Sequence, residues 1–148
     1  MATYTGTSND DTFNGTTGAD TFDFTAHPGG VDTANGDTGT DTLKVDYSTL
    51  TGSDGYGFST NIYGDTDWIG YLRGGLNDYT YFSGIEKLTV KLSSASDYVS
   101  IDATPLGTAG NTISVNAGAG TDYLSIDLRN LSGSTFSDNG SEIGRAHV

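Results

Sequence analysis

The residues best suited to chemistry in this chain are aspartates that close glycine-rich turns. Asp11 and Asp20 each occupy the sixth position of a nonapeptide, in units that span residues 6–14 and 15–23. Asp32 and Asp41 continue the series, so the steps between the four aspartates are 9, 12 and 9 residues. Turn carbonyls and carboxylates are the oxygen ligands that Ca²⁺ takes, about 6–8 at a time. We therefore interpret these aspartates as candidate calcium ligands.

Short apolar segments follow the turns. Phe13 and Phe22 each stand two positions after an aspartate and between polar neighbours, which is typical of a strand that buries one face. A single unit cannot bury its phenylalanine, whereas stacked units can, and stacking also brings turns together. Glycines at the fourth position of the better turns place carbonyls near the aspartates. These glycines are further candidates for the metal site: Gly18, Gly39 and Gly120.

The repeated unit follows the pattern G-G-x-G-x-D-x-U-x, in which U is apolar. In this pattern the chain resembles the RTX, or haemolysin-type, calcium-binding repeat proteins, although Thr7 and Thr16 replace the second glycine. The resemblance implies an all-β fold, a right-handed parallel β-roll or β-helix, with Ca²⁺ as its cofactor. It also implies type I secretion and an extracellular or cell-surface location.

A wider form of the repeat follows later in the chain. Asp97, Asn111 and Asp122 each precede two apolar positions separated by serine, at steps of 14 and 11 residues. We include all three among the candidate ligands, although the neutral amide of Asn111 weakens any site there. We expect fewer bound ions than motif copies. Mg²⁺ should substitute poorly, because it requires a tight octahedral site.

The stacking order follows from the geometry of a β-roll, in which one coil uses two turns and alternate turns share an edge. The predicted pairs are Asp11 with Asp32, Asp20 with Asp41, and Asp97 with Asp122, with Asn111 on the edge opposite the last pair. Each pair should be one strand spacing apart, about 4.8 Å. Two carboxylates that close are unfavourable without a cation between them. Replacement of Asp20 or of Asp41 is therefore expected to remove the same ion.

Between the two sets of repeats, about residues 52–84, aromatic residues alternate with polar ones around Trp68. This pattern predicts an inserted antiparallel β-hairpin of two or three strands. Three interpretations of it compete: a cover over the side or end of the stack, a platform that binds glycans, and a catalytic site.

The core is predicted from the apolar positions of the strands. The expected inward residues are Phe13, Phe22, Leu43, Val45, Leu88, Val90, Val99, Ile101, Ile113, Val115, Leu124 and Ile126.

Composition limits the function. The formal net charge is −13, and 17 of the 19 acidic residues are aspartate, the acid favoured in tight turns and calcium loops. Only 6 residues are Lys or Arg, which argues against nucleic acid as a partner. There are no cysteines and no apolar run of the roughly 20 residues that span a membrane. The sequence has no serine elbow, zinc-protease motif or phosphate loop, so we expect no enzyme.

We interpret residues 1–141 as a single domain, with repeats at 6–47 and 86–130. Residues 142–148 resemble the translation of a sequencing adapter, and we interpret them as a non-native tail. The expected function is a calcium-binding module of a secreted bacterial protein that folds on Ca²⁺. The alternative is a structural or adhesive surface protein, of the S-layer or adhesin kind, whose insert contacts glycans or another cell-surface partner.

Overall fold

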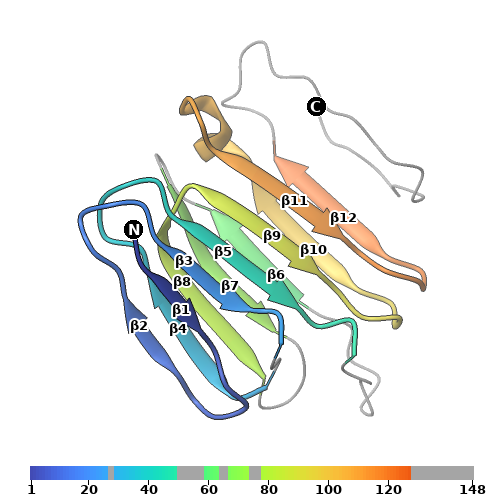
Figure 1. The fold of residues 1–148 in the computed structure, drawn as a ribbon. Helices are drawn as coiled ribbons and strands as arrows, with labels where there is room; N and C mark the ends of the chain where they lie inside the picture. Colours follow the sequence, from blue (N-terminus) through green and yellow to red (C-terminus); the bar gives the residue numbers. More distant parts are fainter. Residues whose placement is uncertain (27–28, 50–58, 64–66, 74–77, 128–148) are drawn as a thin grey trace.

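The computed structural model describes residues 1–26, 29–49, 59–63, 67–73 and 78–127. These residues form two sheets that lie face to face (Figure 1). The first sheet has the strand order β1 (Thr3–Thr5), β3 (Thr21–Phe24), β5 (Thr42–Asp46), β9 (Lys87–Lys91) and β11 (Thr112–Asn116). The second has the order β12 (Tyr123–Asp127), β10 (Tyr98–Asp102), β6 (Ser59–Tyr63), β7 (Trp68–Arg73), β8 (Tyr79–Ile85), β4 (Val31–Asn35) and β2 (Thr12–Asn14).

Apart from the insert, consecutive strands alternate between the two sheets, and neighbours within a sheet are parallel. Thr3 pairs with Thr21, a repeat of 18 residues, whereas Thr12 pairs with Thr33 and Thr21 with Thr42, a repeat of 21. Tyr98 pairs with Tyr123, so the later repeat is 25 residues. The predicted all-β class with largely parallel strands is therefore confirmed. In the described part of the chain the helical content is one 3₁₀ turn, η1 (Thr104–Gly107), and no helix there is long and apolar enough to cross a bilayer.

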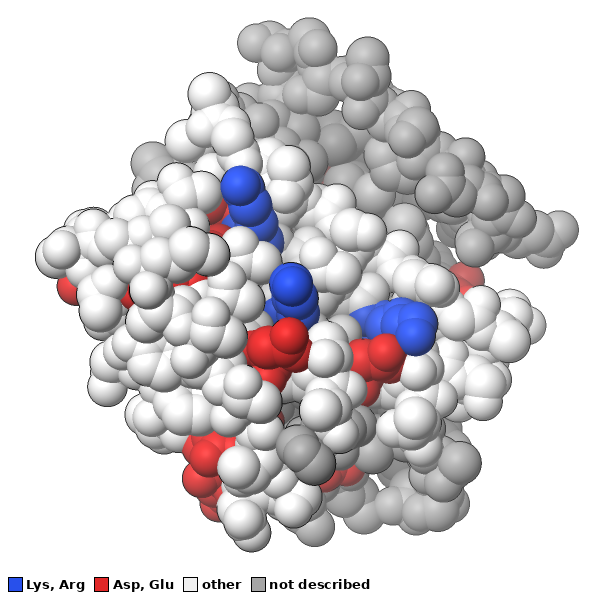
Figure 2. Space-filling model, viewed as in Figure 1, with Lys and Arg blue, Asp and Glu red and all other residues white. Residues whose placement is uncertain are grey.

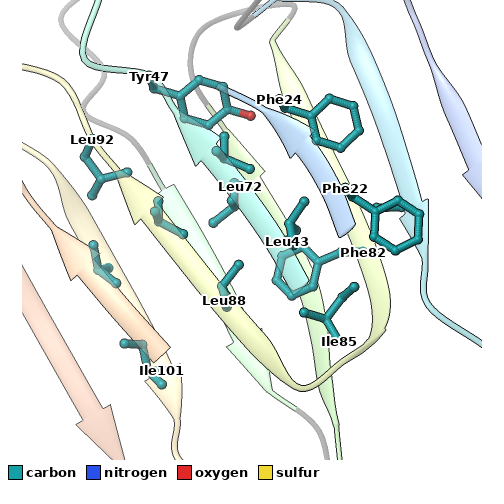
Figure 3. Close-up of a cluster of buried hydrophobic side chains, with 14 of the residues drawn as sticks. Phe22, Phe24, Leu43, Tyr47, Leu72, Phe82, Ile85, Leu88, Leu92 and Ile101 are labelled. Carbon is teal, nitrogen blue, oxygen red and sulfur yellow. The ribbon is translucent and has the colours of Figure 1, made fainter. Parts of the chain in front are cut away.

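The core lies between the sheets (Figure 3). Seven of the predicted inward residues are buried: Phe22, Leu43, Val45, Leu88, Val90, Val99 and Ile101. The other five are partly buried against the same cluster: Phe13, Ile113, Val115, Leu124 and Ile126. At the N-terminal end, the rings of Tyr4 and Phe22 stack with centroids 5.0 Å apart. Full burial of a large apolar side chain such as Phe22 or Leu43 stabilises the folded state by about 1.5–3 kcal/mol.

The insert is antiparallel, as expected, but it does not cover the side or end of the stack. Strand β7 pairs antiparallel with both β6 and β8, while β6 pairs with β10 and β8 with β4. The insert is thus hydrogen-bonded into the middle of the second sheet, where Leu72 and Phe82 enter the core. The outer strands of the insert, β6 and β8, each have one edge whose backbone N–H and C=O groups β7 does not pair. Pairing with β10 and with β4 of the second sheet satisfies these groups. Residues 52–58, 64–66 and 74–77 of the expected insert lie outside the described residues.

The outer face of the first sheet is polar and carries both signs of charge. Figure 2 shows basic side chains beside acidic ones on this face. Lys91 Nζ lies 2.9 Å from Asp46 Oδ2, and both are at least partly exposed. Burial raises the pKa of Asp46, but hydrogen bonds from Ser48 and Lys91 outweigh it and lower the pKa overall. An exposed pair of this kind adds little stability, about 0–1 kcal/mol.

Candidate metal centre

The turn aspartates stack in the pairs that the sequence predicts. The backbone N–H of the first aspartate of each pair donates to a carboxylate oxygen of the second. The three distances are 3.1 Å for Asp11 to Asp32, 2.8 Å for Asp20 to Asp41 and 3.0 Å for Asp97 to Asp122. The predicted pairing is confirmed, because the two aspartates of each pair lie at or just before the starts of adjacent parallel strands of one sheet.

The first-sheet series continues through a residue that the sequence analysis missed. The N–H of Asp41 donates to Glu86 Oε2 at 2.6 Å. Lys87 pairs with Thr42 on one side and Thr112 on the other, which places Glu86 between Asp41 and Asn111. Asn111 thus lies in the turn that enters the first sheet, opposite Asp97 and Asp122, and its Nδ2 donates to the Pro105 carbonyl at 3.0 Å. Counting back one later repeat, 25 residues, from Asn111 reaches Glu86 and could have identified it.

Two of the N-terminal turns are closed by a threonine hydroxyl. Thr16 donates to Asp20 Oδ2 through its N–H at 2.6 Å and through its Oγ1 at 2.8 Å. Thr7 does the same to Asp11 Oδ2, at 2.6 and 2.9 Å. These threonines are the residues that replace the second glycine of the repeat. The deviation from the pattern therefore supplies a hydrogen-bond donor for the aspartate.

A serine plays the same part in a later turn. Ser93 Oγ donates to Asp97 Oδ1 at 3.3 Å and accepts from the N–H of Ala95 at 3.0 Å. Each of these three hydroxyls stands four residues before its aspartate. In all three turns the hydroxyl also accepts from an N–H two residues further on. The arrangement is thus a recurrent turn, in which local side-chain bonds replace part of the solvation of the carboxylate.

The turn before Asp41 differs from these. Asp37 occupies the equivalent position, and with φ of 70° it is the only non-glycine residue with a positive φ in the described part of the chain. Asp41 Oδ1 accepts from Asp20, whereas Asp41 Oδ2 is buried and has no hydrogen-bond partner. A buried carboxylate oxygen without a partner is costly, because it has lost water and gained nothing.

The surroundings of Asp41 Oδ2 are rich in oxygen. A Cβ added to Gly36 would lie 2.7 Å from Asp41 Oδ2 and 1.8 Å from the Gly84 carbonyl oxygen. Both oxygens therefore border the same small space beside the Gly36 backbone. A hollow of about 500 Å³ adjoins this turn, lined by Asn14, Gly15, Asn35, Asp37, Asp67, Ile69, Ser83 and Gly84. The donor set is carboxylate, carbonyl, amide and hydroxyl oxygen, which suits a hard cation.

The pKa shifts also separate the aspartate whose carboxylate is hydrogen-bonded within its turn from those whose burial is less well compensated. The hydrogen bond from the Thr16 N–H leads the interactions that lower the pKa of Asp20. Burial raises the pKa of Asp41 and of Glu86, and the neighbouring carboxylates add to the effect. Burial also raises the pKa of Asp32 to about 6. The Asp41–Glu86 contact is therefore the part of the first-sheet edge where negative charge is least compensated.

Backbone carbonyls would have to complete any cation site. Among the described residues, no three acidic or histidine side chains converge on one point. The predicted glycines serve close stacking of turns: a Cβ on Gly39 would lie 2.8 Å from the Gly18 carbonyl oxygen, and one on Gly120 would lie 2.3 Å from that of Ala95. His27 and Pro28, which belong to the third unit, lie outside the described residues.

Three tyrosines of the insert, Tyr71, Tyr79 and Tyr81, lie on the outer face of the second sheet. Tyr81 is 44% exposed, and its ring stacks on Tyr79 with centroids 5.9 Å apart and contacts Tyr71 at 6.2 Å. The guanidinium of Arg73 lies over the Tyr79 ring at 5.5 Å. Because two of these rings stack on each other, they expose their edges and hydroxyls more than their faces.

Comparison with known proteins gives no match: no protein-family model, no curated protein and no solved structure shows significant similarity to the chain. Residue chemistry and geometry are therefore the basis for the function.

Proposed function

We propose that this chain is a calcium-binding repeat module of the RTX kind, a parallel β-roll that is stabilised by Ca²⁺ outside the cell. The observation that carries the proposal is Asp41 Oδ2, a buried carboxylate oxygen without a hydrogen-bond partner. It borders the Gly84 carbonyl across the Gly36 backbone, so two oxygens of the kinds that Ca²⁺ prefers are in place.

Binding energy at such a site becomes folding energy. Asp41 and Gly84 are far apart in the sequence, so they do not form a site in the unfolded chain. Ca²⁺ would therefore bind the folded state preferentially. A net charge of −13 opposes compaction, and each bound Ca²⁺ reduces it by two. At a free Ca²⁺ concentration about 100 times the Kd, one site adds about 2.7 kcal/mol.

The role proposed is structural, with no catalytic step. The chain would be exported unfolded by a type I system, and Ca²⁺ outside the cell would then complete its folding. This part of the proposal rests on the resemblance of the turns to RTX repeats. The ladder of paired turns on both edges supports it, because a parallel stack of this kind places one turn directly on another.

The test is folding as a function of metal. The chain is passed over a chelating resin, and its circular dichroism and thermal unfolding are followed while CaCl₂ is added to millimolar concentration. We expect Ca²⁺ to increase the β signal and raise Tm, and MgCl₂ at the same concentration to do much less. Identical spectra and Tm values with and without Ca²⁺ would refute the proposal.

The adhesive alternative has one observation in its favour: the exposed Tyr81 lies on β8 two residues before Ser83, which lines the hollow together with Asn35. Neutral glycans use this combination of aromatic and amide contacts. A glycan array probed with the chain in Ca²⁺ tests it, with Tyr81→Ala as the matched variant. Absence of binding to every glycan would remove the alternative.

A further inference from the structure

We propose that a threonine four residues before the aspartate takes the place of a cation, so that Thr7 and Thr16 stand in for an ion, whereas the turn of Asp41, which has no such threonine, is left to bind one. This inference rests on the proposed function and divides the turns into closed and open ones. Closed turns have a Thr whose hydroxyl donates to the aspartate, as at Asp11 and Asp20. The turn of Asp41 is open, because it has Asp37 at that position.

The closed turns satisfy their aspartates without metal. Both oxygens of Asp20 accept hydrogen bonds, Oδ2 from Thr16 and Oδ1 from the N–H of Ala2 at 2.5 Å. A carboxylate with three such donors has little to gain from giving them up to a cation. Asp11 Oδ2 is held by Thr7 in the same way.

The open turn lacks such a donor for a structural reason. Asp37 carries no hydroxyl, and the Asp41 carboxylate receives neither a side-chain bond nor an N–H bond from it. The left-handed φ of Asp37 gives this turn a different backbone from those of Thr7 and Thr16. Asp41 is fully buried, so its second oxygen cannot be satisfied by bulk water. A cation that also contacts the Gly84 carbonyl would supply the missing partner.

The inference changes what Asp20 contributes. Its N–H donates to Asp41 Oδ1 and fixes the orientation of that carboxylate, so Asp20 is a positioning residue through its backbone. Its side chain takes part in a hydrogen-bonded turn and is not a ligand. Substitution at Asp20 and at Asp41 should therefore have different effects on metal binding, although the two residues are stacked neighbours.

The experiment is calcium titration calorimetry on the full chain, comparing Asp20→Asn with Asp41→Asn. We expect Asp20→Asn to bind the same number of ions per chain as the original protein and Asp41→Asn to bind one fewer. Loss of the same ion in both variants would overturn the inference, because Asp20 would then be a ligand. If Asp41→Asn does not fold, the Asp20→Asn stoichiometry alone decides.

A second readout keeps the inference separate from the proposed function. Thr16→Val keeps the shape of the threonine and removes its hydroxyl, so it should lower Tm by a similar amount with and without Ca²⁺. A deficit that Ca²⁺ removes would mean that an ion can hold Asp20, which contradicts the inference. If the original chain binds no Ca²⁺ at all, the proposed function fails, whereas the Thr16→Val deficit in metal-free buffer still reports on the hydroxyl.

Discussion

The N–H of Asp20 donates a 2.8 Å hydrogen bond to Oδ1 of Asp41, which follows it by 21 residues. The same contact joins Asp11 to Asp32 and Asp97 to Asp122. One oxygen of each acceptor aspartate therefore connects consecutive coils. Because this bond needs only a carboxylate in register, we expect fewer ion sites than motif aspartates.

Close stacking of the turns makes a specific prediction for Gly39. In Gly39→Ala, the new Cβ would lie 2.8 Å from the Gly18 carbonyl oxygen, at a backbone φ of 148°. Backbone strain at such a φ costs about 1–3 kcal/mol, and the steric overlap adds about 1–3 kcal/mol. Urea unfolding in saturating Ca²⁺ measures the sum.

Gly110→Ala is the matched control. Gly110 also has a positive φ, of 98°, but a Cβ there meets nothing within 4 Å. This variant should show the backbone strain alone. Equal destabilisation of the two variants would mean that the turns do not approach each other as closely as the structure has them.

The raised pKa of Asp32 predicts how metal-free stability changes with pH. Burial, together with the nearby Asp11, Asp10 and Asp78 carboxylates, raises this pKa from 3.8 to about 6. The folded state therefore binds the proton more tightly than the unfolded state does. The contribution of Asp32 is fully present below about pH 4 and is lost as pH rises from 4 to 6.

Asp32→Asn isolates this contribution from other carboxylates, some of which have lowered pKa values and act in the opposite direction. The measurement is the Tm of metal-free protein, prepared on a chelating resin, for the original chain and for Asp32→Asn between pH 4 and pH 7. Relative to the original chain, the variant should become more stable as pH rises through 5. A difference in Tm that stays constant over this range would show that Asp32 titrates normally.

The pairing of the turns and most of the core could be predicted from the sequence, because both follow from the spacing of the repeat. The spacing of the motif aspartates determines the length of an early coil, and the period-2 alternation identifies Phe22 and Leu43 as inward residues. Glu86 was missed because glutamate replaces the motif aspartate there, although Gly84 stands two residues ahead of it, at the fourth position of the motif. Its place follows only from the pairing of Lys87 with Thr42 and Thr112.

The position of the insert in the second sheet and the hydrogen bonds of the turn hydroxyls could not be predicted from the local sequence pattern. Alternating aromatics predict antiparallel strands, but β6 and β8 find their partners through open edges of the second sheet, which are a property of the whole stack. Likewise, in the sequence alone, threonine in place of the second glycine indicates only a poorer match to the repeat. Only the 2.8 Å contact between Thr16 Oγ1 and Asp20 shows that the change adds a donor.

Core packing predicts unequal losses for two equivalent positions of the repeat. Phe22 is fully buried, and Phe22→Ala should destabilise the domain by about 3–5 kcal/mol in chemical denaturation. Phe13 occupies the same position of the preceding unit but lies on the edge strand β2 and is only partly buried. Phe13→Ala should therefore cost about half as much or less. Comparable losses would place Phe13 deeper in the core than the structure does.

The hydroxyls of Tyr47 and Thr80 predict a coupling between the two sheets. They lie 2.7 Å apart in the core, and Tyr47 directly follows β5 of the first sheet whereas Thr80 belongs to β8 of the second. Burial raises the pKa of Tyr47, so its hydroxyl stays protonated. Tyr47→Phe removes one partner and leaves the Thr80 hydroxyl without this bond, at a cost of about 1–3 kcal/mol.

A double-mutant cycle with Thr80→Val separates the hydrogen bond from packing. Both substitutions keep the shape of the side chain and remove a hydroxyl, so neither should create a cavity. Once Thr80 is valine, removing the Tyr47 hydroxyl no longer leaves this polar group without its partner, and the second change should cost much less than the first. Urea unfolding of the four proteins in saturating Ca²⁺ should give a coupling of about 0.5–3 kcal/mol, the range for residues in direct contact. Strictly additive losses would mean that the two hydroxyls do not bond to each other.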